Sequence, residues 1–435
     1  MREVKVGTAE RVITPPLGGK MAGFAARKGV SQGVHDDLHV RAIVLEGPET
    51  AVAVLSASVL YLDQDVVDDV RERAEGLTGL PGGNIMMAAT HTHSGPVVSG
   101  DYAEFLKEQC VACLVDAWER RGLGRVGVGV GRVEDVCRNR RRLEYGGLPV
   151  DPEVGVVKVE DASGSVKGVL FNYACHPSTL GPHNLQITED WVYYAVRTVK
   201  EGLGKDLVVA FVNGAEGDIN PGYSSGLSAI GAHIPIRTFE YAEKIGTRLG
   251  RAVLEVLAEV WTRATFPLRC LSKRVDLPLR RSFPLTLEQA EERLREAQEE
   301  LKKMGPDVPL VLRHKAEVAA FLAEMAYERA KEFYSGSWGQ SVSVELQSIR
   351  VDDAALTSFP GEVFVELGLE VKRRSPFRKT LVVGLANGRS AGYLPTRETY
   401  YEGDYEVVAA KYSEEAGEVL VEETLEQLER LAREG

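Results

Sequence analysis

Short apolar segments alternate with amphipathic ones over the first 260 residues, and this feature constrains the fold of the 435-residue chain more than any other. Residues 51–58 and 84–90 are typical of buried strands, and residues 63–76 between them have helical spacing. Strand, helix and strand in this order predict a parallel pair with a right-handed crossover. Further runs predict one more helix and two more strands: residues 101–121, 167–175 and 206–212. We therefore expect an α/β fold with a mixed, largely parallel sheet and flanking helices.

The pattern becomes purely helical between residues 285 and 336. Thr286-Leu287-Glu288-Gln289 is a capping box, and apolar residues recur after it at spacings of three and four. Gly305-Pro306 ends that helix, and a second one is expected over residues 310–333. Strand-like runs resume afterwards, and no flexible linker or repeat interrupts the chain. We predict one domain over residues 1–435, with residues 285–336 as a helical hairpin inserted in it.

Composition excludes several classes of protein. Hydrophobic residues make up 44% of the chain and charged residues 27%, values typical of a globular protein. The apolar segments are far shorter than the roughly 18 residues that span a bilayer, so no stable membrane insertion is expected. The formal charge of -12 argues against a nucleic-acid partner. The first residues contain no export signal, and five cysteines without a disulfide-like spacing suggest reduced thiols, so we expect a cytoplasmic protein.

Polar residues gather where the predicted strands end. Open α/β sheets bind their ligands at the carboxyl ends of strands. Three of the eight histidines, three acidic residues and a tyrosine lie at such ends: His91, His93, His176, Glu216, Asp218, Glu362 and Tyr393. Loop composition accounts for the glycines and prolines beside them but not for the histidines. We therefore expect the active site at the strand carboxyl ends.

The histidines and Glu362 suggest a metal site. His91 and His93 either bind one metal jointly, or one is a ligand and the other a base. An isolated His-x-His pair is more often a hydrogen-bonded surface pair, but His176 and Glu362 at other strand ends favour the metal. Two histidines and a carboxylate that leave a position for water are the ligands of catalytic zinc hydrolases. The run Asn139-Arg140-Arg141-Arg142 is either a solvated charged face or the source of one arginine for this cleft.

These motifs together resemble a known family. Thr90-His91-Thr92-His93-Ser94-Gly95-Pro96, His176-Pro177, Gly217-Asp218-Ile219-Asn220-Pro221, Pro360-Gly361-Glu362 and the pair Tyr393 and Tyr405 are similar to the catalytic domain of neutral/alkaline non-lysosomal ceramidases. The resemblance runs in order from Gly7 to about Tyr405. It implies a zinc amidase that cleaves the N-acyl bond of ceramide, with one Zn²⁺ per chain.

The resemblance also implies roles for individual residues. By the family's pattern, four residues would be zinc ligands: His91, His176, Glu362 and Tyr393. His93 would be the catalytic histidine beside the metal and would act as a base. Arg140 would hold the substrate, and Tyr405 would be a second active-site tyrosine; both would donate hydrogen bonds to the oxyanion.

Two departures from the family affect the expected substrate and mechanism. The family's enzymes carry an immunoglobulin-like domain after the catalytic one, whereas this chain ends in a predicted helix over residues 414–433. We therefore expect a small N-acylated or lipid-like substrate, better hydrolysed when it is soluble than as membrane ceramide. The serine that is sometimes assigned as a nucleophile is Asn220 here, which favours attack by water that the metal activates.

The resulting prediction is a zinc-dependent amidohydrolase acting on an N-acyl bond. Two alternatives remain: a metal-dependent esterase, lactonase or deacetylase on a soluble substrate, and a catalytically silent binding protein of the same fold. Neither the acyl length nor the oligomeric state follows from the sequence.

Overall fold

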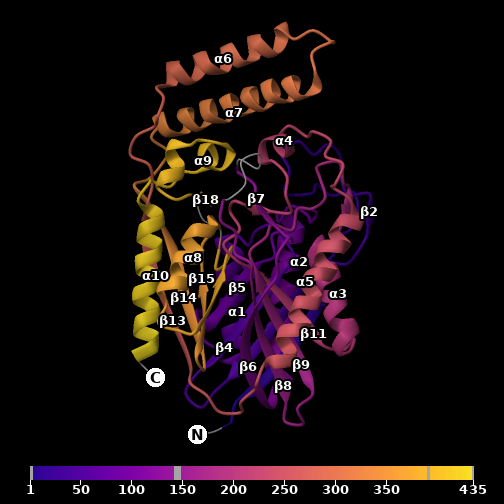
Figure 1. Ribbon diagram of the computed structural model, residues 1–435. Coiled ribbons are helices and arrows are strands. Elements are labelled where there is room, and N and C mark those ends of the chain that lie inside the picture. The colour runs from indigo at the N-terminus through magenta and orange to yellow at the C-terminus, as the bar shows by residue number, and fades with distance from the viewer. Residues whose placement is uncertain (1–2, 142–147, 389–391, 434–435) are drawn as a thin grey trace.

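The computed structural model describes residues 3–141, 148–388 and 392–433, and Figure 1 shows two stacked sheets with helices on their outer sides. The larger sheet has eight strands. In spatial order they are β11 (Val208–Asn213), β9 (Val166–Tyr173), β8 (Glu153–Asp161), β6 (Gly122–Arg132), β1 (Lys5–Val12), β3 (His39–Glu46), β4 (Ala51–Ala57) and β5 (Ile85–Ala89). The smaller sheet has four: β13 (Leu268–Pro278), β14 (Ser341–Val351), β15 (Ala354–Ser358) and β17 (Lys379–Val383).

Alternate residues of the large sheet face different layers. Val40 and Val44 of β3 pack toward helices α1 (Gln64–Thr78) and α2 (Gly100–Glu119), whereas Ile43 packs toward the small sheet. Phe171 of β9 faces helices α3 (Trp191–Leu203) and α5 (Phe239–Glu259). The outer face of the small sheet is covered by α8 (Val365–Arg374) and α10 (Ala416–Arg433). The result is a four-layer arrangement of helices, sheet, sheet and helices.

The α/β class and the mixed sheet are confirmed, but the large sheet is not largely parallel. Among its described strands, the outermost pairs, β11 with β9 and β4 with β5, are parallel. The pairs between them are antiparallel. Parallel pairing of β4 and β5 through α1 is as predicted. Continuous apolar strands show that both faces of a sheet are buried, and here a second sheet buries the other face of antiparallel strands as helices would in a parallel sheet.

Curvature of the large sheet brings its ends together. Strand β11 at one edge packs against β4 and β5 at the other, and the Ser56 hydroxyl donates to the carbonyl oxygen of Phe211 between them. The Asn213 side chain likewise donates to the carbonyl oxygen of Thr90, at 3.4 Å. Loops that follow β5, β9 and β11 therefore meet at one end of the molecule, although β5 and β9 lie far apart in the strand order.

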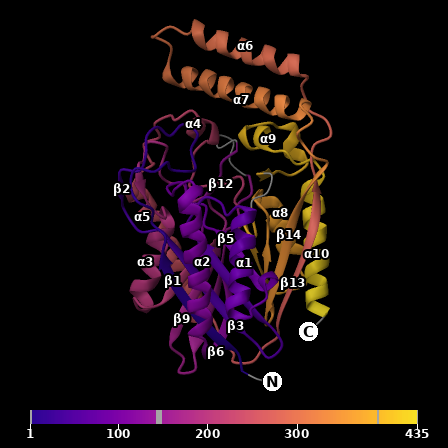
Figure 2. The same ribbon diagram turned by 180° about the vertical axis from the view of Figure 1, so that it is seen from behind.

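Helices α6 (Leu287–Lys303) and α7 (Leu310–Tyr334) form an antiparallel pair over that same end (Figures 1 and 2). The predicted capping box is present, since the Thr286 hydroxyl accepts from the Gln289 amide and the Gln289 side chain accepts from the Thr286 amide. Helix α7 packs against two short helices, α4 (Ser225–Ala229) and α9 (Tyr405–Ala409). The described ends of the chain lie at the opposite end of the molecule. That this hairpin is an insertion within one domain stays a prediction.

Short strand pairs and two 3₁₀ helices complete the described fold. These are β2 (Gly33–Val34) with β10 (Gln186–Ile187), β7 (Arg138–Asn139) with β12 (Ile219–Asn220), β16 (Glu362–Val363) with β18 (Tyr393–Leu394), η1 (Gly82–Asn84) and η2 (Glu398–Tyr401). In the β16–β18 pair Glu362 lies directly opposite Tyr393. Within the described ranges, none of the helices combines the length and apolar character that crossing a bilayer requires.

Candidate metal centre

Three predicted site histidines converge beneath the hairpin. His91 and His93 follow β5, and His176 follows β9. The ring centroid of His91 lies 4.9 Å from that of His93 and 4.8 Å from that of His176. The ring centroids of His93 and His176 are 5.6 Å apart. The strand ends at Ala89, and His91 has a left-handed backbone with φ of 71°. The two rings of the His-x-His motif nevertheless stay in one cluster.

Hydrogen bonds to carbonyl oxygens fix the tautomers of His91 and His176. His91 Nδ1 donates to the carbonyl oxygen of Leu60 at 2.8 Å, which leaves Nε2 without a proton and without a hydrogen-bond partner. His176 Nδ1 lies 2.9 Å from the carbonyl oxygens of both Glu216 and Ile219, so its Nε2 is also the unprotonated nitrogen. Burial lowers the pKa of His176 to about 3, with the Arg140 charge as a further cause, which keeps the ring neutral. Carbonyl partners of this kind orient histidines that bind metals.

Both unprotonated nitrogens face the same carboxylate oxygen. Glu362 Oε2 lies 3.1 Å from His176 Nε2 and 3.5 Å from His91 Nε2, and Tyr61 donates its hydroxyl to Glu362 Oε1. Glu362 is only 3% exposed, so its buried carboxylate faces two ring nitrogens that carry lone pairs and no protons.

These atoms fit a divalent cation. Lone pairs of two imidazoles and a carboxylate that point at one another repel unless a positive charge lies between them. Ligands at about 2.1 Å from a tetrahedral zinc are separated by about 3.4 Å, which agrees with the distances of 3.1 and 3.5 Å. The described residues contain two overlapping groups with metal-ligand spacing: His91, His93 and His176, and His91, Glu216 and Glu362.

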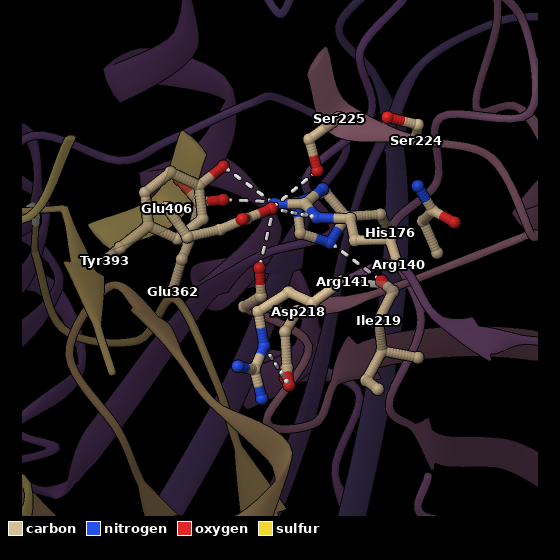
Figure 3. A network of polar contacts seen from close by, with 12 residues as sticks. Arg140, Arg141, His176, Asp218, Ile219, Ser224, Ser225, Glu362, Tyr393 and Glu406 are labelled. Atoms are coloured by element: carbon tan, nitrogen blue, oxygen red, sulfur yellow. Dashed lines mark hydrogen bonds and ion pairs between the residues drawn. The ribbon is translucent and has the colours of Figure 1, made fainter. Parts of the chain in front are cut away.

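Arg140 and Tyr393 form the neighbouring wall of the site, as Figure 3 shows. Arg140 donates to the Tyr393 hydroxyl at 3.0 Å, to the Gly217 carbonyl oxygen at 2.8 Å and to Glu406 at 2.6 Å. Burial raises the pKa of Tyr393 well above its ordinary value, and the Glu362 charge adds to this. The Tyr393 phenol is therefore neutral. Arg142, the last residue of the run that contains Arg140, lies outside the described residues.

A cavity of about 490 Å³ opens in front of these groups. His91, His93, Glu362, Tyr393 and Tyr405 line it, together with Arg329 of α7. Both ring nitrogens of His93 lack a hydrogen-bond partner, and burial holds its pKa well below its ordinary value. Gly23, with φ of 102°, packs against His93, and a β-carbon there would lie 2.6 Å from the His93 Cα. The structure therefore brings all seven residues with a predicted role to this cavity or to the side chains that form its wall: His91, His93, Arg140, His176, Glu362, Tyr393 and Tyr405.

The turn after β11 holds His176 in place through main-chain oxygens, and the Asp218 side chain does not contact the histidine. The Asp218 carboxylate accepts from Asn139 at 2.6 Å and from the Val365 amide at 2.9 Å, and the histidine itself is bound by main-chain oxygens. The Asn220 side chain bonds Gly222 and Tyr223 and so shapes the turn.

Sequence reasoning missed Tyr61 and Glu406, and it placed the ligand-spaced Glu216 at a strand end without giving it a role. Tyr61 follows β4, and the rule of examining every strand end would have found it. Glu216 was visible in its loop but had no distinguishing pattern. Glu406 follows Tyr405 in a short helix, where its contact with Arg140 has no sequence signal.

Comparison with known proteins agrees with the sequence motifs. The model of the family described as neutral/alkaline non-lysosomal ceramidase, N-terminal, matches residues 4–229. The neutral ceramidase of Pseudomonas aeruginosa is 24% identical over 89% of this chain and 66% of its own length. That of Drosophila melanogaster is 25% identical over 50% of this chain and 36% of its own. The chain thus spans less than two thirds of the length of these relatives.

Solved structures show the same fold. The crystal structure of neutral ceramidase from Pseudomonas aeruginosa matches with a TM-score of 0.74 at 20% identity, over 99% of this chain and 75% of that one. A structure described as ceramidase complexed with C2 matches with a TM-score of 0.75 at 18% identity, over 100% and 76% of the two chains. With the family model matching more than half of its residues, the chain belongs to the neutral/alkaline non-lysosomal ceramidase family.

Proposed function

We propose that this protein is a zinc-dependent amidohydrolase that cleaves the N-acyl bond of a small, ceramide-like substrate. The observation that carries the proposal is the convergence of His91 Nε2 and His176 Nε2 on Glu362 Oε2 at a cavity. Membership of a family whose relatives are named neutral ceramidases supports the type of bond. His91, His176 and Glu362 would hold one zinc ion per chain, with Tyr393 as a further ligand.

A bound zinc ion supplies Lewis acidity, which polarises a carbonyl and lowers the pKa of a bound water. The chain's own groups then handle protons and charge. His93 is neutral, lacks a partner at either nitrogen and faces the cavity, so it would accept the proton of the attacking water and return it to the leaving amine. Tyr405 keeps its phenol proton, because burial and then Glu362 raise its pKa. It would donate that proton in a hydrogen bond to the oxyanion.

Arg140 would fix the geometry of this wall. Its guanidinium is tied to Glu406, and Ser225 donates to the same Glu406 oxygen at 2.6 Å. Such a buried ion pair keeps Arg140 charged next to the Tyr393 hydroxyl, where a developing negative charge would be stabilised.

Helix α7 supports a small or single-chain substrate. Its Arg329 lines the cavity, and its Phe321 stacks on Tyr405 with ring centroids 6.3 Å apart. The cavity of about 490 Å³ is within the usual range for small-molecule sites, about 300–1,000 Å³. A cytoplasmic location also belongs to this proposal, and the five free cysteines support it.

A panel of N-acylated amines tests the function. Purified protein with its metal content measured is incubated with ceramides of short and long acyl chains, N-acyl amino acids, acetylated sugars and the matching esters. The proposal expects free amine from at least one N-acyl compound, with loss of activity after chelation and recovery with Zn²⁺. Hydrolysis of the esters alone would replace it with the esterase alternative.

A further inference from the structure

Glu216 is a buried carboxylate that neither the fold nor the proposed chemistry explains. It follows β11, its side chain is 0% exposed, and neither carboxylate oxygen has a hydrogen-bond partner. The other buried acidic side chains around the site are bonded: Glu406 to Arg140 and Ser225, and Asp218 to Asn139 and Val365. Glu216 is the exception among these neighbours.

A buried carboxylate without a partner is costly unless a proton or a cation neutralises it. Arg140 is the guanidinium beside this loop, but its hydrogen bonds go to Glu406, Tyr393 and the carbonyl oxygen of Gly217. A cation bound between Glu216 and Glu362 would neutralise both carboxylates.

The main chain holds Glu216 firmly at this position. Its carbonyl oxygen accepts from His176 Nδ1 at 2.9 Å, and the next amide, that of Gly217, donates to the Val363 carbonyl oxygen at 2.9 Å. Gly384 makes room for the side chain, since a β-carbon there would lie 2.7 Å from Glu216 Oε2. The backbone bonds that orient His176 and pack against β16 thus also aim the Glu216 carboxylate.

The Glu216 carboxylate lies beside the proposed metal ligands. One oxygen of Glu216, one oxygen of Glu362 and one ring nitrogen of His91 all lie within 4.8 Å of one another. Small side-chain movements would bring such atoms to the roughly 2.1 Å at which zinc binds nitrogen and oxygen. No other protein group needs to be displaced, because both Glu216 oxygens and His91 Nε2 lack partners.

We infer that Glu216 is a protein ligand of the same divalent cation as His91, His176 and Glu362. This inference rests on the metal site of the proposed function and adds a second carboxylate to it. Two carboxylates balance the double positive charge of the ion, whereas one leaves a net positive charge. Carboxylate oxygens also suit manganese better than imidazoles do. The centre should therefore accept Mn²⁺ as well as Zn²⁺.

Metal affinity of the Glu216→Gln variant is the test, since this change keeps the shape and removes the charge. Metal-free full-length protein is titrated with Zn²⁺ and with Mn²⁺ in competition with a chromophoric chelator. Glu160→Gln is the control, because Glu160 is also buried but pairs with Lys158 at the end of β8 that lies away from the carboxyl end of β9. We expect Zn²⁺ affinity to fall about 100-fold or more in Glu216→Gln. We expect a larger loss for Mn²⁺ and little change in the control.

Thermal unfolding supplies a second readout that a merely structural role would not move in the same way. Removal of an unbalanced buried charge should leave the metal-free variant at least as stable as metal-free wild type. The rise in Tm on adding Zn²⁺ should be smaller in the variant. If Glu216→Gln does not fold, Glu216→Asp keeps the charge, shortens its reach and is measured in the same way.

The outcomes separate this inference from the proposed function. Wild-type affinity for Zn²⁺ and Mn²⁺ in both Glu216 variants, or in the one that folds, would overturn the ligand role and leave the metal hydrolase standing. Failure of wild type itself to bind either ion would overturn both. Hydrolysis of the amine panel is scored separately, so an inactive wild type that binds Zn²⁺ would remove the function and not the ligand.

Discussion

At the scale of single residues, the tautomers of His91 and His176 determine what the site can bind. The Nδ1–H group of each ring donates a hydrogen bond to a carbonyl oxygen, and the unprotonated Nε2 faces Glu362. Replacement of either ring by alanine removes one proposed zinc ligand, so His91→Ala and His176→Ala should lose their zinc. Metal analysis of the purified variants checks this, with His183→Ala, an exposed histidine bonded to Gly231, as control. Full zinc occupancy in both variants would contradict the ligand assignment.

The role of His93 as a base or as a metal ligand needs a test, because its ring also has metal-ligand spacing to His91 and His176. As a base, it should be dispensable for metal binding but needed for proton transfer. His93→Ala should therefore keep its zinc and lose turnover by about 10²–10⁴-fold. Metal content and kcat are measured on the same preparation. Loss of the metal would instead make His93 a third histidine ligand.

The predicted site residues could be found from the sequence because strands bring their carboxyl ends to common edges, which makes His91, His176 and Glu362 recognisable as a set. Tyr61 also follows a strand, β4, so the same rule reaches it. Glu216 lies in a loop at a strand end, but the direction of its side chain depends on a few ångströms of loop geometry that no residue pattern fixes.

At the scale of elements, the sequence predicts the bounds of helices α6 and α7 closely, whereas of the sheet pairings it predicts that of β4 with β5 and not the antiparallel ones. The Thr286 capping box and Gly305-Pro306 are local signals, and they mark the two ends of α6. Pairing of β8 with β6 and β9 depends instead on contacts between distant segments. Apolar strands buried on both faces leave the direction of their neighbours open, which is why parallel pairing was overestimated.

Helix α7 should influence substrate choice through Arg329, which lines the cavity and is paired with Glu332. Loss of this partly exposed cation should raise KM for an N-acyl compound with a carboxylate group by about five-fold, with a smaller effect on a neutral one. Steady-state kinetics of Arg329→Ala with the two substrates checks this. Arg295→Ala on the exposed face of α6 is the control. Equal effects on both substrates would argue against a role for the charge.

Replacement of the whole hairpin tests its larger role. A short turn in place of residues 286–333 removes the cover from α4 and α9 but none of the predicted ligands. We expect the order of preference among N-acyl substrates to change while the zinc content stays near one per chain. Metal analysis and the amine panel measure the two effects. Loss of zinc with unchanged preference would show that the hairpin supports the metal centre instead.

At the scale of the whole molecule, a buried ion pair ties the large sheet to the segment before α3. Arg41 of β3 contacts Glu189 at 2.8 Å, and both side chains are almost completely buried. Burial alone would raise the pKa of Glu189, but Arg41 and then His39 hold it far below its ordinary value. The carboxylate therefore stabilises the fold above its unfolded-state pKa of about 4.3, and this contribution is lost as the pH falls through the folded-state value.

Glu189→Gln tests this dependence. The variant leaves the Arg41 charge without its main partner and should lower the free energy of unfolding at pH 7 by about 3–5 kcal/mol. The difference from wild type should shrink below a pH of about 4. Urea unfolding at several pH values measures it, with the exposed Glu292→Gln as a control of little effect. A difference independent of pH would assign the loss to packing rather than charge.

The distances in sequence between the predicted ligands have a consequence for how the protein is made. His91 and His176 come from loops of the large sheet, whereas Glu362 and Tyr393 come from the short β16–β18 pair near the end of the chain. Synthesis proceeds from the N-terminus, and early segments fold first. A growing chain therefore displays both histidines and Glu216 on the ribosome long before Glu362 exists. The proposed metal centre can be completed only once most of the polypeptide has emerged, so we expect the proposed hydrolytic activity to appear at the end of biogenesis and not in a partly made chain.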